Sequence, residues 1–100
     1  MKSDWEYFVY IMANQRHTVL YVGMTSGLPG RVKEHKEKRF KKSFSAKYNI
    51  DKLVHYEIYN NVEEAILRER QLKAGSRQKK IDLINTNNPE WKDLSDDWEL

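Results

Sequence analysis

The sequence has no cysteine, and it has only two prolines and four glycines among its 100 residues. Without cysteine there is no disulfide framework, thiolate metal site or cysteine nucleophile, and a reducing compartment suits such a chain. No apolar run reaches the roughly 20 residues that span a bilayer, and residues 1–6 are too acidic for a signal peptide. We therefore expect a soluble, cytoplasmic protein with no membrane partner.

Several familiar catalytic patterns are missing as well. The sequence contains no glycine-rich phosphate loop, no His-Glu-x-x-His pair and no serine in a nucleophile elbow. These absences argue against nucleotide hydrolases and zinc proteases. His17, His35 and His55 are isolated in the sequence, and a lone histidine is usually structural or solvated.

The composition suits one compact domain. With 39% hydrophobic and 12% aromatic residues, 100 residues can bury one modest core, and they are too few for two. We therefore predict a single domain over residues 1–100, in which residues 89–100 form an acidic C-terminal tail. Trp91, Leu94 and Trp98 of this tail are expected to pack against the body of the domain.

Charge is unevenly distributed along the chain. Residues 31–47 contain eight basic residues against Glu34 and Glu37, and residues 68–80 contain six against Glu69. Residues 89–100 contain five acids against Lys92. A nucleic acid would be attracted to the two basic stretches and not to the tail. Solvated helix faces would explain the same lysines without a nucleic acid.

The first two elements are predicted to form a hairpin. Residues 7–12 and 19–24 are short β-branched and aromatic runs, and residues 14–17 between them have turn character. If the loop has four residues and closes symmetrically, Met12 lies opposite Val19 and Tyr10 lies opposite Tyr21. A slip of one residue would move one tyrosine to the other face.

The rest of the chain alternates helices with one strand. After a turn cluster at 25–30, a basic helix is expected over 31–42, followed by a strand over 53–59 with Val54, Tyr56 and Ile58 on one side. Asn61 resembles a helix cap for a helix over 62–73 that Gly75 stops, and Ser76 begins a last helix. This order predicts an α+β fold with a small three-stranded antiparallel sheet flanked by helices.

Glu69 is the most unusual residue of the helix over 62–73. It falls within the apolar stripe of this helix, four residues after Ala65 and three before Leu72. A carboxylate that points toward a core or cleft must be paired, hydrogen-bonded or bound to a metal. A structural ion pair and a site for a hard cation such as Mg²⁺ or Mn²⁺ both remain open on these grounds.

The sequence resembles the GIY-YIG nuclease family, in particular its small stand-alone members and, more distantly, the N-terminal nuclease domain of the excinuclease. The resemblance covers residues 7–94 and rests on the order and spacing of several motifs. These motifs are Phe8-Val9-Tyr10 and Tyr21-Val22-Gly23 at the two signature triplets, Arg31 followed by His35, the helix segment 65–73 with Glu69, and Asn88-Pro89-Glu90-Trp91 at the end. Two residues depart from the pattern: Phe8 replaces the first glycine, and Met24 replaces a lysine of the excinuclease-like domains.

The resemblance implies a metal-dependent DNA endonuclease. Glu69 would hold a single Mg²⁺ or Mn²⁺ ion, and Arg31 would donate hydrogen bonds to the phosphate. Tyr21 would accept the proton of the attacking water, with Tyr10 in support and His35 positioning water or phosphate. An ordinary tyrosine has a pKa of about 10, so such a base needs cations nearby.

The basic helix would hold the DNA backbone without reading its sequence, through Lys33, Lys36, Lys41 and Lys42. A noncatalytic nucleic-acid-binding module on the same fold is the main alternative, and a protein-interaction domain with a docking acidic tail is a third interpretation. The DNA substrate, a targeting partner and the oligomeric state are left open. Repair, restriction and mobile-element roles are all compatible with these residues.

Overall fold

The sheet has three antiparallel strands in the order β2-β1-β3. The computed structural model describes residues 5–38 and 47–100. Its elements are β1 (Tyr7–Ala13), β2 (Leu20–Thr25), α1 (Leu28–Glu37), β3 (Lys52–Tyr59), α3 (Val62–Ala74) and α4 (Arg77–Asn87). The α+β fold and the predicted order of elements are therefore confirmed.

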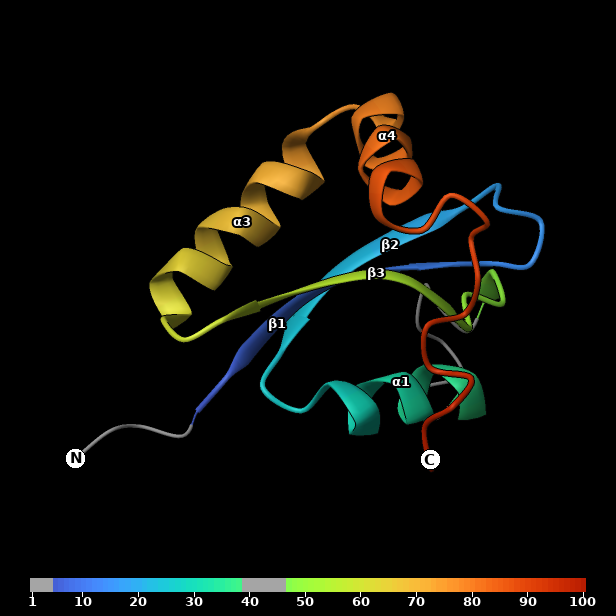
Figure 1. Cartoon of the computed structure of the whole chain (residues 1–100), viewed down its shortest axis with the longest axis horizontal. Helices are drawn as coiled ribbons and strands as arrows, with labels where there is room; N and C mark the ends of the chain where they lie inside the picture. The colour runs from blue at the N-terminus through green and yellow to red at the C-terminus, as the bar shows by residue number, and fades with distance from the viewer. Residues whose placement is uncertain (1–4, 39–46) are drawn as a thin grey trace.

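The two faces of the sheet carry different helices (Figure 1). Alternate residues of β1 point to opposite faces, so this central strand contributes to two apolar clusters. Val9 and Ile11 pack in a cluster with Ala65 of α3 and Ile84 of α4. Tyr10 belongs to the other cluster, which holds Met12, Leu28, Val32, Ile50 and Leu53. The sheet is thus a middle layer between α1 and the pair α3 and α4.

The hairpin register differs from the predicted one by two residues. Met12 lies opposite Tyr21, and Tyr10 lies opposite Gly23. The connection runs from residue 14 to residue 19 and is longer than expected, because the side-chain oxygen of Asn14 accepts hydrogen bonds from the backbone of Thr18 (2.9 Å) and residue 19 (3.0 Å). A shift of two preserves the face on which each side chain lies. Both tyrosines therefore still share the α1 face, as diagonal neighbours.

The prediction that Val54, Tyr56 and Ile58 share one face is wrong. The register between β1 and β3 shifts between Ile11 and Met12, which lie opposite His55 and Leu53, so β3 has one extra residue there. Val54 therefore packs in the cluster of α3 and α4. Tyr56 lies on the α1 side, opposite Tyr10.

Helix α1 begins earlier than predicted, because Pro29 occupies its first turn and the predicted turn cluster at 25–30 runs into the helix. Lys38 caps it in the left-handed conformation, and the expected continuation to residue 42 lies outside the described residues. In contrast, α3 begins as predicted: the side chain of Asn61 accepts hydrogen bonds from the backbone of Glu63 and Glu64. Ser76 caps α4 in the same manner.

The acidic tail packs on the domain, as predicted. After α4 the chain passes the start of β3 and reaches α1 (Figure 1). Trp91 joins the cluster of α3 and α4, whereas Leu94 and Trp98 pack against the cluster beneath α1. The buried side chain of Asn88 donates hydrogen bonds to the carbonyl oxygens of Val54 (3.1 Å) and Lys92 (2.8 Å), which holds the turn at the start of this segment.

Candidate active site

Tyr10, Tyr21 and His35 form a cluster between β1, β2 and α1. The hydroxyl of Tyr10 lies 3.2 Å from Nε2 of His35, and both residues are buried. The ring centroids of Tyr10 and Tyr21 are 6.2 Å apart, and those of Tyr21 and His35 are 5.2 Å apart. Tyr21 is only partly buried. Three side chains from two strands and one helix therefore meet at one place.

Tyr10 can reach this place because Gly23 has no side chain. A Cβ atom built on Gly23 would overlap the hydroxyl and the adjoining ring carbon of Tyr10. The phenol thus lies across the backbone of β2, directly over its pairing partner. A glycine inside a strand indicates such a close approach, and this signal was present in the sequence at Gly23. Its contact with Tyr10 was not predicted.

Arg31 and Glu69 act on the same phenol from opposite sides of the sheet. Burial raises the pKa of Tyr10 well above its ordinary value, Tyr21 adds to this rise, the nearby Arg31 opposes it and Glu69 raises it further. Arg31 lies four residues before His35 on α1, so the two share a helix face. The fold places Glu69 near enough for its charge to affect the pKa of Tyr10, which lies 59 positions away in the sequence.

His35 is held as a neutral ring. Burial lowers its pKa, and the charge of Arg31 lowers it further, while Glu34 has the opposite effect. A neutral histidine accepts at one ring nitrogen, so Tyr10 can donate its hydroxyl proton to Nε2. Such a bond would hold the ring of Tyr10 against His35.

Glu69 is partly exposed and has one close partner among the described residues. Its carboxylate lies 3.3 Å from Nζ of Lys73, one turn further along α3, and its side chain is 22% exposed. Within residues 5–38 and 47–100, no three acids, histidines or cysteines gather in a way that could hold a metal ion. Mg²⁺ commonly takes one or two carboxylates and completes its shell with water and substrate phosphates. Glu69 therefore fits a divalent cation that phosphate oxygens and water also coordinate.

The four lysines of the predicted DNA footprint have different surroundings. Lys33 is exposed on α1. Nζ of Lys36 lies 2.5 Å from Asp93 and donates to the backbone carbonyl of Asp51 at 2.9 Å, so this lysine holds the C-terminal segment. Lys41 and Lys42 lie outside the described residues. Met24, the departure from the excinuclease-like pattern, packs against the cluster of α3 and α4.

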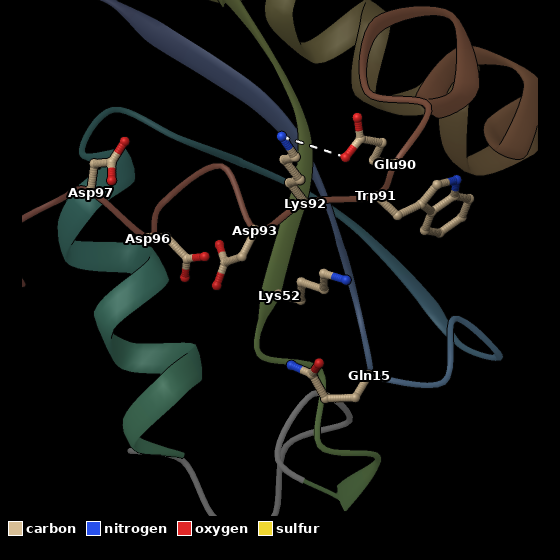
Figure 2. A pocket seen from close by; sticks show the side chains of 8 residues that line it. All are labelled: Gln15, Lys52, Glu90, Trp91, Lys92, Asp93, Asp96 and Asp97. Atoms are coloured by element: carbon tan, nitrogen blue, oxygen red, sulfur yellow. Dashed lines mark ion pairs between the residues drawn. The ribbon is translucent and has the colours of Figure 1, made fainter.

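A pocket of about 540 Å³ lies apart from this cluster, under the C-terminal segment (Figure 2). It is lined by residues of the hairpin loop, of β3 and of positions 90–97, and by none of the five candidate catalytic residues. Asp93 forms an ion pair with Lys36, and Glu90 forms one with Lys92 at 3.5 Å. This pocket is therefore not part of the candidate active site.

Comparison with known proteins identifies the family of the chain. Residues 6–82 match the GIY-YIG catalytic domain. The chain belongs to the GIY-YIG family. This is a nuclease-type family, and its catalytic domain implies DNA as the substrate and a divalent metal as the usual cofactor. In the described part of the chain, no helix has the length and apolar character needed to cross a membrane.

Proteins similar to this chain occur in several bacteria. The chain is 34% identical over 80 residues to a UPF0213 protein of Syntrophus aciditrophicus, covering 80% of this chain and 91% of the relative. It is 34% identical over 83 residues to a UPF0213 protein of Clostridium perfringens, covering 79% and 83%. The solution NMR structure of a UPF0213 protein from Bacillus halodurans has the same fold, with a TM-score of 0.56, 24% identity and coverage of 92% and 97%. The chain is thus similar to small stand-alone proteins.

Proposed function

We propose that this protein is an endonuclease that hydrolyses DNA phosphodiester bonds with a single Mg²⁺ or Mn²⁺ ion, in DNA repair or processing. The observation that carries the proposal is the convergence of Tyr10, Tyr21, His35 and Arg31, with the charge of Glu69 acting on the same phenol. A noncatalytic binding module would need cations at this place, but it would need no partly buried carboxylate beside them.

Each residue has a distinct task in this proposal. Arg31 donates hydrogen bonds to the phosphate, to which its forked donors and permanent charge are suited. Glu69 holds the divalent ion, which supplies charge stabilisation at the scissile phosphate and leaving oxygen. Tyr21 accepts the proton of the attacking water, because it is the more accessible of the two tyrosines. Tyr10 and His35 position Tyr21 through ring contacts.

A panel of DNAs tests the proposed activity. Duplex, flapped, branched and single-stranded DNAs of the same sequence are incubated with the protein in Mg²⁺, in Mn²⁺ and in chelator. We expect cleavage of at least one substrate that requires a divalent ion and stops on chelation. Binding is measured on the same DNAs in chelator. Binding to DNA without cleavage of any substrate in either metal would identify the protein as a noncatalytic binding module instead.

Two matched variants test the tyrosine assignment. Tyr21→Phe removes the proposed proton acceptor and keeps the ring, so we expect cleavage to slow by about 100-fold or more. Tyr10→Phe removes a buried hydroxyl that lies 3.2 Å from Nε2 of His35, so we expect a smaller loss at the same metal concentration. Rates are measured over a range of pH in both variants. A larger loss in Tyr10→Phe would transfer the role of base to Tyr10.

A further inference from the structure

A second, smaller pocket lies where β2 begins, next to the first turn of α4. It has a volume of about 230 Å³ and is lined by Thr18, Val19, Leu20, Arg77 and Lys80. Among the described residues, the lining contains two cations and a hydroxyl group, and it contains no carboxylate. A concave site with this composition attracts anions.

Neutral groups hold both cations in place. Arg77 donates from Nη2 to the carbonyl oxygen of His17 at 2.8 Å, and Lys80 donates from Nζ to the carbonyl oxygen of Gly75 at 2.7 Å. These bonds orient the side chains without neutralising their charge. The hydroxyl of Thr18 accepts a hydrogen bond from Asn14 at 2.8 Å, which leaves its own proton for a further acceptor. Hydrogen bonds thus hold three polar side chains of the lining in place before any ligand arrives.

The first turn of α4 adds positive potential at the same place. This turn contains no acid and carries Arg77, Lys79 and Lys80. The N-terminus of a helix already has a partial positive charge, so acids are favoured there and three cations are unfavourable. A bound anion would relieve this repulsion. Lys80 also lines a neighbouring pocket between α3 and α4, together with Lys79 and Arg68.

The position of the pocket connects it with the proposed active site. Leu20 is followed on β2 by Tyr21, and the two side chains point to opposite faces of the sheet. Leu20 packs on the side of α3, which carries Glu69, and β2 is an edge strand. A DNA strand that lies along this edge would therefore contact the candidate active site and the pocket together.

We infer that Arg77, Lys80 and Thr18 form a phosphate-binding site for the DNA backbone, separate from the site of the scissile phosphate. The inference rests on the proposed nuclease function for the identity of the ligand. It assigns a role in binding to the second basic stretch of the sequence, residues 68–80. It also predicts that DNA extends along β2 toward the hairpin loop, beyond the surface of α1.

The salt dependence of DNA binding tests this site. Binding of duplex DNA is measured in chelator for the unmodified protein, Arg77→Gln and Lys80→Gln, so that cleavage plays no part. The logarithm of affinity falls linearly with the logarithm of salt concentration, and each lost phosphate contact makes this slope about 0.9 less steep. If a variant and the unmodified protein bind equally at 1 M salt, the variant therefore binds about eightfold more weakly at 0.1 M salt. Lys92→Gln is the matched control, because Lys92 is exposed on the C-terminal segment and pairs with Glu90. We expect no change of slope in this control.

Each outcome separates this inference from the proposed function. A reduced slope in Arg77→Gln and Lys80→Gln supports the site, even if the unmodified protein cuts none of the tested DNAs. An unchanged slope in both folded variants overturns the site, even if cleavage is observed. Thermal unfolding of each variant verifies the fold, and Lys80→Gln decides the question if Arg77→Gln releases the hairpin loop and unfolds.

A titration with inorganic phosphate distinguishes the two sources of the same chemical group. NMR spectra of the protein are recorded with increasing phosphate at constant ionic strength. We expect only weak shifts around Arg77, because a backbone phosphate is delivered by the rest of the DNA. Tight binding of free phosphate that both variants abolish, combined with unchanged DNA slopes, would mean that the pocket takes a free phosphate and would overturn the inference.

Discussion

Glu57 and Glu69 are two glutamates with nearly equal exposure and opposite surroundings. Their side chains are 19% and 22% exposed. Glu57 interacts with His55 Nε2 at 2.8 Å, Tyr59 Oη at 2.6 Å, and Arg68 Nε and Nη2 at 2.8 and 3.0 Å. Glu69 has Lys73 at 3.3 Å as its one close partner in the described residues. Partners, and not burial, distinguish the two carboxylates.

The pKa values around Glu57 reflect its network. Burial alone would raise the pKa of Glu57, but hydrogen bonds from His55, Arg68 and Tyr59 and the charge of Arg68 lower it well below its usual range. Burial and the hydrogen bond to Glu57 raise the pKa of Tyr59 to about 12. Every oxygen of Glu57 is thus used within the fold. We interpret Glu57 as a structural ion-pair partner and Glu69 as a carboxylate that is available to a ligand.

The positions of Arg68 and Glu69 on α3 explain why the two glutamates have different partners. Arg68 and Glu69 are consecutive residues, so their side chains diverge by about 100° around the helix. Arg68 points to β3, where it pairs with Glu57. Glu69 acts on Tyr10, whose ring lies across β2. One helix therefore completes a structural network with one residue and contributes to the candidate active site with the next.

The largest expected effect is that of Glu69→Gln on cleavage. Glutamine keeps the volume and hydrogen-bonding capacity of the side chain but removes the charge that a hard cation requires. We expect a loss of about 100-fold or more in metal-dependent cleavage. Thermal stability should be nearly unchanged, and affinity for DNA without metal should stay equal or increase. Glu63→Gln on the same helix is the control, and a folded Glu69→Gln protein that still cuts DNA would remove the metal ligand from the proposal.

The matching substitution Glu57→Gln should affect stability instead. It leaves Arg68 without its carboxylate in a partly buried site, which we expect to cost about 3 kcal/mol of unfolding free energy. The folded protein should retain cleavage at close to the original rate. Urea unfolding and cleavage are measured on the same sample. Equal stability together with lost cleavage would reverse the roles that we assign to the two glutamates.

Acid unfolding provides a weaker test of the same network. Because the folded pKa of Glu57 is lowered, its contribution to stability is present above the unfolded pKa of about 4.3 and is lost as pH falls through the folded value. Below about pH 4 the stability of the protein should fall by up to about 1.4 kcal/mol per pH unit through this group. Glu57→Gln should remove this part of the decline. Parallel pH curves for both proteins would contradict the assignment.

The smallest expected effect is that of Lys73→Met. The ammonium of Lys73 competes with a metal ion for Glu69, but an i,i+4 pair on a helix surface contributes only about 0.3–0.5 kcal/mol. We therefore expect about a twofold decrease in the Mg²⁺ concentration that gives half-maximal cleavage. Lys92→Met, on the exposed C-terminal segment, is the control. An increase in the required Mg²⁺ would mean that Lys73 supports the site instead of competing in it.

Local patterns in the sequence were sufficient for most of the fold. The apolar runs predicted the strands, and Asn61, Ser76 and Gly75 predicted the ends of helices α3 and α4. These signals act within one helical turn or one strand, so neighbouring residues determine them. Glu69 was also recognisable, because its place in the apolar stripe of α3 indicates a carboxylate near other structure. The sequence did not show whether Glu69 forms a structural ion pair or binds a ligand.

Tertiary structure decided the details that need distant partners. The hairpin register depends on the side chain of Asn14 in the loop, and the extra residue in β3 reverses the face of Val54 relative to Tyr56. Lys36 was predicted to bind DNA from its charge, yet its nearest anion is Asp93, 57 residues away.

Sequence by itself therefore determined the order of the elements and the residues that cap α3 and α4, because these depend on residue type and short spacing. The set of candidate catalytic side chains came from the resemblance of several motifs to those of the family. Only the tertiary structure decided that Glu57, and not Glu69, has hydrogen-bond donors at both carboxylate oxygens. His55, Tyr59 and Arg68 reach Glu57 from two elements, whereas within residues 5–38 and 47–100 Glu69 has Lys73 as its single close partner. The free energy of a carboxylate depends on the donors within about 4 Å of it, and folding alone assembles those donors.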